Sequence, residues 1–412
     1  MDAKPFWMTH NFAPVAEEVT AFDLPVEGEL PAELEGTFLR NGPNPRDGAS
    51  PHWLVGSGMV HGIELGGGQA RWYRNRYVEG RNNTHVIAHA GRILALVEAR
   101  LPIELDRELG TIGPFDFGGA VDTAFTAHPK LCARTGELHF FGYQFGPPHI
   151  TYYVADAAGR VLRRHVVEVE GASYLHDFAL TEHHAVFFDT PARMTSDWGR
   201  GKLPFEWKEG HATRIGVVPR DGSGPARWFP ISTCVLSHTA NAFEEDGRIT
   251  IDGIKLARLD MVPPCLHRWQ IDLASGEVRE TVLDPRPVDF PRIDERKVGL
   301  RHRYTYVVEL RLKHGAPAGS LLRRHDSVTG ESRACDLGDA QMPNECVLAT
   351  GADPAEDAGW LLAFVYDADR HGSDLVVLDA REFGAPPVAR VRLPQRVPFG
   401  FHGSWVPATA QP

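Results

Sequence analysis

The sequence lacks an apolar run long enough to cross a bilayer. Its longest unbroken apolar run is Trp360–Tyr366, whereas a helix needs about 20 mainly apolar residues to span the hydrocarbon core. The N-terminal residues also lack the basic segment, apolar stretch and small-residue cleavage site of a secretory signal. We therefore expect a cytoplasmic protein with no transmembrane segment and at most weak peripheral contact with a membrane.

An excess of positive charge is missing as well. The 412 residues include 43 Lys and Arg against 54 Asp and Glu, which gives a formal net charge of −11. A general nucleic-acid-binding protein needs a basic surface to neutralise phosphates. We therefore expect no nucleic-acid partner.

Cysteines are few, and their spacing suggests no pairs. The five cysteines are widely spread, and no two of them form a CxxC motif. This pattern excludes a disulfide framework and a cysteine-based zinc site. We interpret them as buried thiols, because free cysteine behaves mainly as a small apolar side chain.

Long helical periodicity is absent, and short β-type runs take its place. Runs of four to eight β-branched and aromatic residues recur between Gly, Asp and Pro, for example at residues 137–143, 150–154 and 304–308. Such runs are typical of strands. The sequence therefore predicts an all-β fold.

One turn type recurs between these strands. Asp156–Gly159, Asp272–Gly276 and Asp326–Gly330 each begin with Asp and end with Gly. Asp can accept hydrogen bonds from the backbone that follows it, and Gly supplies a positive φ, so each segment predicts a β-hairpin. Antiparallel hairpins spread along the chain favour a β-propeller. Two stacked β-sandwiches are the alternative.

The chain shows no internal linker. Its 31 Pro and 41 Gly are spread as turns rather than gathered in one segment, so we expect a single domain over residues 1–412. Residues 191–212 interrupt the strand pattern. We expect a long loop or short helices there, as an insertion that covers an active site.

Four of the 20 histidines lie in local sequences of small or apolar residues: His128, His176, His238 and His402. They are too far apart in sequence to be the i, i+4 pair of a helical zinc motif. In a propeller they would converge on the axis from different blades. Four imidazoles suit iron(II), copper or zinc, and this pattern leaves the metal open.

Three acidic residues lie in apolar or aromatic surroundings: Glu98, Asp289 and Glu345. Metal-binding histidines usually donate their second ring N–H to a carboxylate or a carbonyl group. These acids are candidates for that role. The alternative is that each one pairs with an arginine.

Several motifs in a fixed order are similar to those of the carotenoid cleavage oxygenases, a family that includes the lignostilbene dioxygenases. The resemblance extends from Phe22 to Pro407. The motifs that carry it are Gly36–Pro45, Thr126–Lys130, His176–Glu182, Asn241–Gly247, Leu266–Trp269 and Gly400–Pro407.

The resemblance implies a seven-bladed propeller with a cap of loops and short helices over an axial metal site. It also implies one iron(II) per chain, with O2 as co-substrate. The residues that match the family's four iron ligands are His128, His176, His238 and His402. Those that match the three acids behind the ligands are Glu98, Asp289 and Glu345.

The resemblance extends to Thr84, and the sequence departs from the family at Asp289. Thr84 matches a threonine that lies over an open iron position in many members of the family. Asp289 stands where the family normally has glutamate. Because its side chain is one methylene shorter, we expect it to reach its histidine only with a backbone shift or through a water.

Other departures concern the substrate. Stilbene-cleaving members bind a phenol hydroxyl with a lysine and a tyrosine; here Val97 stands at the lysine position, and Tyr77 matches the tyrosine. The chain also runs directly from Val78 to Asn82, where other members carry a longer segment at a membrane-facing entrance. In addition, Val55 and Ser57 replace two acids.

The resemblance therefore implies a non-haem iron(II) dioxygenase that cleaves a conjugated C=C bond of a carotenoid or apocarotenoid to aldehyde or ketone products. The substrate is then a small apolar olefin. Cleavage of a lignostilbene or phenylpropenoid is the alternative. A propeller that binds without turnover is a third hypothesis, and the oligomeric state stays open.

Overall fold

The computed structural model describes residues 4–98, 100–195, 205–259, 263–313 and 316–410. Strands are the main regular secondary structure of these residues, and turns and loops connect them. The helical elements among them are four single turns of 3-10 helix: η1 (Phe6–Met8), η2 (His10–Phe12), η3 (Glu295–Lys297) and η4 (Ala408–Ala410). None of the described helices is long and apolar enough to cross a membrane.

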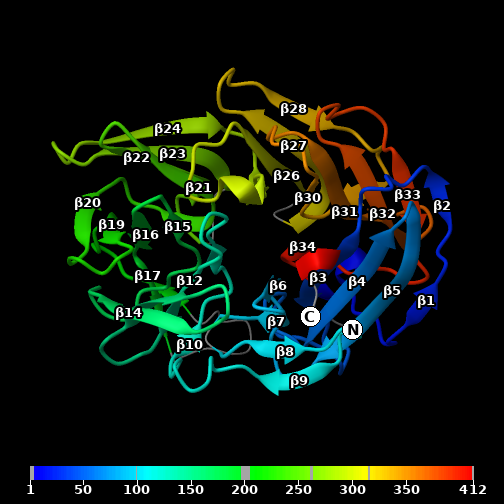
Figure 1. Cartoon of the computed structure of the whole chain (residues 1–412), viewed down its shortest axis with the longest axis horizontal. Helices are drawn as coiled ribbons and strands as arrows, with labels where there is room; N and C mark the ends of the chain where they lie inside the picture. Colours follow the sequence, from blue (N-terminus) through cyan, green and yellow to red (C-terminus); the bar gives the residue numbers. More distant parts are fainter. Residues whose placement is uncertain (1–3, 99, 196–204, 260–262, 314–315, 411–412) are drawn as a thin grey trace.

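Seven antiparallel sheets form the blades of a β-propeller and are arranged as a ring (Figure 1). Blade 1 contains β1 (Thr20–Phe22), β5 (Gln69–Val78), β4 (Gly58–Gly66), β3 (Gly36–Pro43) and β34 (Gly403–Pro407). Blade 2 contains β6 (His85–His89), β7 (Arg92–Leu96), β8 (Ile103–Leu105) and β9 (Thr111–Pro114). Blade 3 contains β10 (Ala124–Phe125), β11 (Lys130–Leu131), β12 (Leu138–Tyr143), β13 (Ile150–Ala155) and β14 (Val161–Val167).

The ring continues through four further blades. Blade 4 contains β15 (Ala179–Leu180), β16 (His184–Asp189), β19 (Arg214–Pro219) and β20 (Arg227–Pro230). Blade 5 contains β21 (Val235–Glu245), β22 (Arg248–Leu256), β23 (Cys265–Asp272) and β24 (Val278–Asp284). Blade 6 contains β25 (Val288–Arg292), β26 (Tyr304–Lys313), β27 (Ala316–Asp326) and β28 (Ser332–Cys335). Blade 7 contains β29 (Gln341–Pro343), β30 (Val347–Thr350), β31 (Gly359–Asp367), β32 (Gly372–Asp379), β33 (Ala389–Arg392) and β2 (Val26–Gly28).

The two ends of the chain close the ring. The C-terminal strand β34 pairs with β3 in blade 1, and the N-terminal strand β2 pairs with β33 in blade 7. In Figure 1, β34 is drawn in red near the middle of the ring. Blades 1 and 7 therefore each combine residues from both ends of the sequence.

Seven apolar clusters hold the blades together, one at each interface between neighbours. Phe38 of blade 1 packs against Phe364 of blade 7 with ring centroids 4.9 Å apart. In β16, Phe187 joins the cluster with blade 3, whereas Phe188 joins the cluster with blade 5. Because successive side chains of a strand point to opposite faces, sheets buried on both faces need the short, unbroken apolar runs that the sequence shows.

The predicted Asp–Gly hairpins are confirmed. Asp156 Oδ1 accepts hydrogen bonds from the backbone N–H of Ala158 (3.0 Å) and of Arg160 (2.8 Å). Gly159 and Gly276 have φ values of 81° and 78°, and the third turn has Gly330 at 75°. These turns join neighbouring strands within blades. The ring of seven sheets confirms the propeller prediction, and the two-sandwich alternative is wrong.

The segment at residues 191–212 differs from its prediction. Instead of a loop or short helices, its described part contains β17 (Ala192–Met194) and β18 (Phe205–Trp207), which pair as a small separate sheet. The pairing of Ala192 with Trp207 joins positions that no local pattern connects. Residues 196–204 of the predicted insertion lie outside the described residues.

All five cysteines are free. Four of them are buried, and Cys265 is partly buried.

Candidate metal centre

Each of the seven blades contributes one residue to a cluster around the propeller axis. The four histidines come from blades 1, 3, 4 and 5, and the three acids come from blades 2, 6 and 7. The residues in blade order are His402, Glu98, His128, His176, His238, Asp289 and Glu345. Innermost strands of successive blades face one axis, which explains why such widely spaced residues meet.

The local backbone aims the imidazoles inward. His128 lies between β10 and β11, and His176 and His402 precede the innermost strands of their blades. His238 lies within β21, where the register with β22 shifts between Leu236 and Thr239. A β-bulge of this kind changes the direction of a side chain.

The structure brings the four imidazoles together. The ring centroid of His128 lies 4.5 Å from that of His176, 5.1 Å from that of His238 and 4.7 Å from that of His402. The Nε2 atoms of His176 and His238 are 3.1 Å apart. Ligand atoms of His128, His238 and His402 lie within 4.8 Å of one another, so the cluster could hold a metal ion.

The three acids contact three of these histidines through the Nδ1 atoms. His176 Nδ1 bonds to Glu98 Oε1. His238 Nδ1 lies 2.6 Å from Asp289 Oδ1, and His402 Nδ1 lies 2.9 Å from Glu345 Oε1. A carboxylate at Nδ1 fixes the N–H there and leaves Nε2 with its lone pair free for a metal.

The fourth histidine supports the same interpretation. His128 is buried, and its Nε2 has no hydrogen-bond partner among the described residues. Burying an unpaired ring nitrogen costs free energy unless something else satisfies it. A cation bound by four neutral imidazoles would satisfy it, so the residues present fit a metal ion.

The electrostatics favour neutral imidazoles at two positions. Burial lowers the pKa of His128 and of His402 well below the ordinary value, and the neighbouring histidines lower it further. Burial also acts to lower the pKa of His176, but the Glu98 carboxylate outweighs it and the pKa is raised. Likewise, burial acts to raise the pKa of Asp289, but His238 outweighs it and the pKa is lowered.

One supporting network was not predicted from the sequence. Asp177 is buried and forms an ion pair with Lys130 Nζ at 2.8 Å. Its Oδ2 accepts hydrogen bonds from the backbone N–H of Thr239 (2.7 Å) and from the Thr239 hydroxyl (2.9 Å). Asp177 therefore ties together the three chain segments that carry His128, His176 and His238. Its signal in the sequence was an acid directly beside a candidate ligand.

A cavity of about 630 Å³ opens onto the cluster, and we call it the apolar cavity. His176, His238 and His402 form part of its wall. Its remaining lining is largely apolar and includes Trp53, Leu54, Val97, Phe145, Met194, Phe205, Leu236, Leu256, Phe290 and Phe401. A concave, mainly apolar site beside a few polar groups is the usual form of a small-molecule pocket.

Aromatic side chains shape the cavity wall next to the histidines, and the sequence analysis did not single them out. The Phe290 ring stacks on the His238 ring, with centroids 5.6 Å apart. The backbone of Phe290 has a φ of 56°, a conformation that is rare for a bulky side chain. The Tyr174 hydroxyl lies 3.2 Å from His176 Nδ1. The sequence signal that could have identified Phe290 as a site residue is its position directly after Asp289.

The structure separates the remaining predicted residues. Thr84 and Val97 both line the apolar cavity, whereas Tyr77 is not among its described lining residues. The Tyr77 hydroxyl donates a hydrogen bond to the Val15 carbonyl at 3.1 Å and accepts one from Asn44 Nδ2 at 2.8 Å. The expectation that Tyr77 contacts substrate is therefore not supported, because its hydroxyl is already bonded within the protein.

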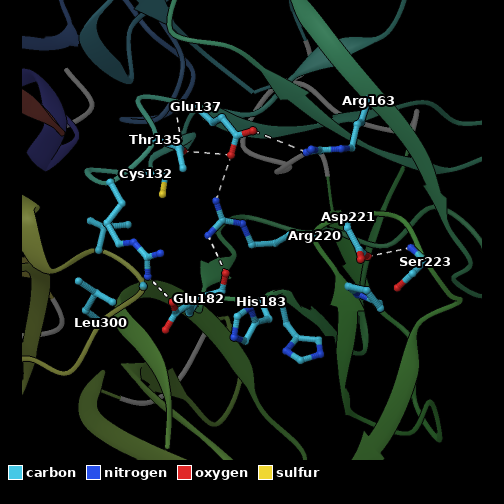
Figure 2. A pocket seen from close by; sticks show the side chains of 15 residues that line it. Cys132, Thr135, Glu137, Arg163, Glu182, His183, Arg220, Asp221, Ser223 and Leu300 are labelled. Carbon is cyan, nitrogen blue, oxygen red and sulfur yellow. Dashed lines mark hydrogen bonds and ion pairs between the residues drawn. The ribbon is translucent and has the colours of Figure 1, made fainter.

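A second cavity, of about 460 Å³, lies between blades 3 and 4 and contains none of the four histidines (Figure 2). Its charges are paired. Arg134 forms an ion pair with Glu182, and Arg163 and Arg220 both contact Glu137. Figure 2 shows the Glu137 carboxylate between the two guanidinium groups. The three arginines of this cavity therefore pair with its two glutamates.

Comparison with known proteins decides the family. A family model described as retinal pigment epithelial membrane protein matches residues 12–82 and 79–407. The chain belongs to this family. A carotenoid cleavage oxygenase of Mycobacterium tuberculosis is 36% identical over 485 aligned positions, which cover 96% of this chain and 96% of that protein.

Two further relatives are named for isoeugenol and for lignostilbene. An isoeugenol monooxygenase of Pseudomonas nitroreducens is 31% identical, with 96% of each chain covered. The crystal structure of a Pseudomonas brassicacearum lignostilbene dioxygenase superposes with a TM-score of 0.90, at 29% identity and with 98% of each chain covered. The likeness to propeller dioxygenases confirms the predicted fold class and the prediction of a dioxygenase.

Proposed function

We propose that the protein is an iron(II)-dependent dioxygenase that cleaves a conjugated C=C bond of a carotenoid or apocarotenoid and gives two aldehyde or ketone products. The observation that carries the proposal is the convergence of four imidazoles, three of which form part of the wall of an apolar cavity. In this proposal the whole chain, residues 1–412, acts as one domain. A cytoplasmic location stays a prediction.

In this proposal His128, His176, His238 and His402 hold one iron(II). Glu98, Asp289 and Glu345 keep the Nδ1–H tautomer of three of them, so that each Nε2 points to the ion. The chemistry that iron(II) supplies when bound is one-electron chemistry with O2, the co-substrate. The acids are positioning residues here, because they act through the histidines.

The other tasks fall to the cavity wall. Val97, Phe290 and Phe401 exclude water and hold an extended olefin by apolar contact. Thr84 lies in the same wall, and its hydroxyl donates a hydrogen bond to Asn83 Oδ1 at 3.1 Å. In this proposal Thr84 would restrict access from the cavity to a bound metal ion. A double bond held in one place beside the cluster gives one cleavage site.

The second candidate function is cleavage of a stilbene or phenylpropenoid. The likeness to the lignostilbene dioxygenase and the isoeugenol monooxygenase supports it. Val97 opposes it, because valine cannot pair with a phenol hydroxyl. The bonded hydroxyl of Tyr77 opposes it too. These two residues are the reason that we favour the carotenoid class.

The test is product mass spectrometry after incubation with iron(II), O2 and a panel of apocarotenoids, carotenes and 4-hydroxystilbenes. We expect two carbonyl fragments from an apocarotenoid, whose summed composition equals substrate plus two oxygen atoms. Protein loaded with zinc is the control and should give no fragments. Fast cleavage of a hydroxystilbene with no cleavage of any apocarotenoid would make the second candidate correct. A folded, iron-loaded protein that cleaves nothing in the panel would favour the hypothesis of a binding protein without turnover.

A further inference from the structure

Two arginines line the apolar cavity without an acidic partner. Arg81 and Arg100 are exposed members of the cavity lining. Within the described ranges of the chain, neither guanidinium forms an ion pair or a hydrogen bond. The two acids of the cavity, Glu98 and Asp289, are already bonded to His176 and His238. The cavity therefore carries two positive charges that no acid in its described lining pairs with.

The two arginines lie on neighbouring stretches of backbone. Strands β6 and β7 pair His85 with Leu96, and the backbone N–H of Thr84 continues the pairing with a hydrogen bond to the Leu96 carbonyl at 2.9 Å. Asn82 Nδ2 then donates hydrogen bonds to the carbonyls of Ala95 (3.0 Å) and Leu101 (2.9 Å). Arg81 and Arg100 directly precede Asn82 and Leu101. They therefore share one edge of the cavity, on blade 2.

The connection that carries Arg81 is short. Strand β5 ends at Val78 and β6 begins at His85. The Asn82 bonds fix this connection against the segment after β7, so the backbone at both arginines is held in place. Two guanidinium groups on a fixed backbone are a better anion site than two on free loops, because less freedom is lost on binding.

The second cavity provides the contrast. Its three arginines, Arg134, Arg163 and Arg220, each contact a glutamate, as Figure 2 shows for Glu137. Those guanidinium groups are held by acids of the protein itself. The described lining of the apolar cavity offers Arg81 and Arg100 no such acid, because its two acids are bonded to histidines.

We propose that Arg81 and Arg100 bind a carboxylate at one end of the substrate. The inference rests on the proposed function and names its substrate class: a conjugated olefin with an apolar body and a terminal acid. Guanidinium groups match the geometry of a carboxylate and can bind it with two parallel hydrogen bonds. The acid then lies at the edge formed by blade 2, the apolar chain fills the cavity, and one of the two carbonyl products keeps the carboxylate.

The test compares acids with their methyl esters. The arms are an apocarotenoic acid and a stilbene-4-carboxylic acid, each with its ester, because both compounds carry the same terminal group. We expect the acid of the preferred class to have a kcat/KM at least about tenfold above its ester. In Arg81→Gln and Arg100→Gln the KM for the acid should rise, most of all in the double variant, while kcat and the ester kinetics change little.

Two controls separate this effect from general charge. Arg134→Gln removes one positive charge from the second cavity and should leave the ratio of acid to ester unchanged. Added salt should raise the KM for the acid and not that for the ester, because exposed charges are screened. A wild-type protein that treats acid and ester alike, or an acid preference that survives in the double variant, would overturn the inference. The inference would also be overturned if the double variant lost binding to anionic vesicles but kept the wild-type ratio of kcat/KM for acid and ester. That result would favour a membrane contact.

Failure of the proposed function gives a different result. If neither acid nor ester is cleaved, quenching of tryptophan fluorescence still reports binding, since Trp53 lines the cavity. Tighter binding of the acid in the wild type and its loss in the double variant would then support the carboxylate site without the reaction. Equal binding of acid and ester would refute the site as well.

Discussion

Asp289 Oδ1 lies 2.6 Å from His238 Nδ1, although aspartate is shorter than the glutamate expected at this position. The register between β25 and β26 shifts between Asp289 and Arg292. The same carboxylate accepts hydrogen bonds from the Phe290 backbone N–H (2.8 Å) and from the Ser237 hydroxyl (3.0 Å). Asp289 therefore contacts His238 directly, without a bridging group. The irregular backbone begins at Asp289, as expected if a backbone shift compensates for the shorter side chain.

Asp289→Asn tests this contact. The variant should fold normally but lose roughly 10- to 100-fold in iron affinity or activity, the usual cost of removing a carboxylate behind a ligating histidine. Competition with a chelator measures the affinity, and circular dichroism measures the fold. Glu245→Gln is the matched control, because Glu245 pairs with Arg301 on the exposed surface. Unchanged iron affinity in Asp289→Asn would refute a role for this acid.

Removal of the 4-hydroxyl group from a hydroxystilbene should change kcat/KM by less than about tenfold, or roughly 1.4 kcal/mol in transition-state binding. An unpaired phenol in an apolar cavity gains nothing from Val97, and Tyr77 is bonded elsewhere. Steady-state kinetics on the two compounds measures the ratio. Tyr77→Phe should leave it unchanged. A strict requirement for the hydroxyl, lost in Tyr77→Phe, would show that the tyrosine reaches the substrate.

The lowered pKa of Glu244 predicts that the free energy of unfolding depends on pH in the acid range. Burial acts to raise its pKa, but hydrogen bonds from His184, Thr181 and the His183 backbone outweigh burial and lower the pKa from 4.5 to about 2. A lowered pKa in the folded state stabilises the fold above pH 4.5, and this contribution is lost as the pH falls through about 2. The difference in free energy of unfolding between wild type and Glu244→Gln should therefore shrink between pH 5 and pH 2. Urea unfolding at several pH values measures it, and a constant difference would contradict the assignment.

Much of the fold could be predicted from local patterns. The Asp156–Gly159 turn and the apolar runs depend on neighbouring residues only, so they are visible in the sequence. The number of blades is not local, and it came from the family resemblance alone. The pairing of Ala192 with Trp207 was missed because it joins two short segments across a long loop.

Some residues of the candidate site could also be predicted from local sequence, whereas others depend on the fold. The four histidines could be found because small and apolar neighbours surround each one. Substrate contact by Tyr77 stays a prediction that the structure does not support, because a motif match does not reveal that Asn44 and Val15 already bond its hydroxyl. Arg81 and Arg100 could not be found at all, since their presence in the apolar cavity depends on how two connections fold together.

The most direct test of the account is the iron content of the wild type and of four variants in which His128, His176, His238 or His402 is replaced by Ala. After loading with iron(II) and desalting, elemental analysis should find one iron per wild-type chain and much less in every variant, with turnover abolished. His183→Ala is the control, because His183 lines the second cavity, and it should keep its iron. A single variant among the four that retains full iron and normal turnover would contradict the account.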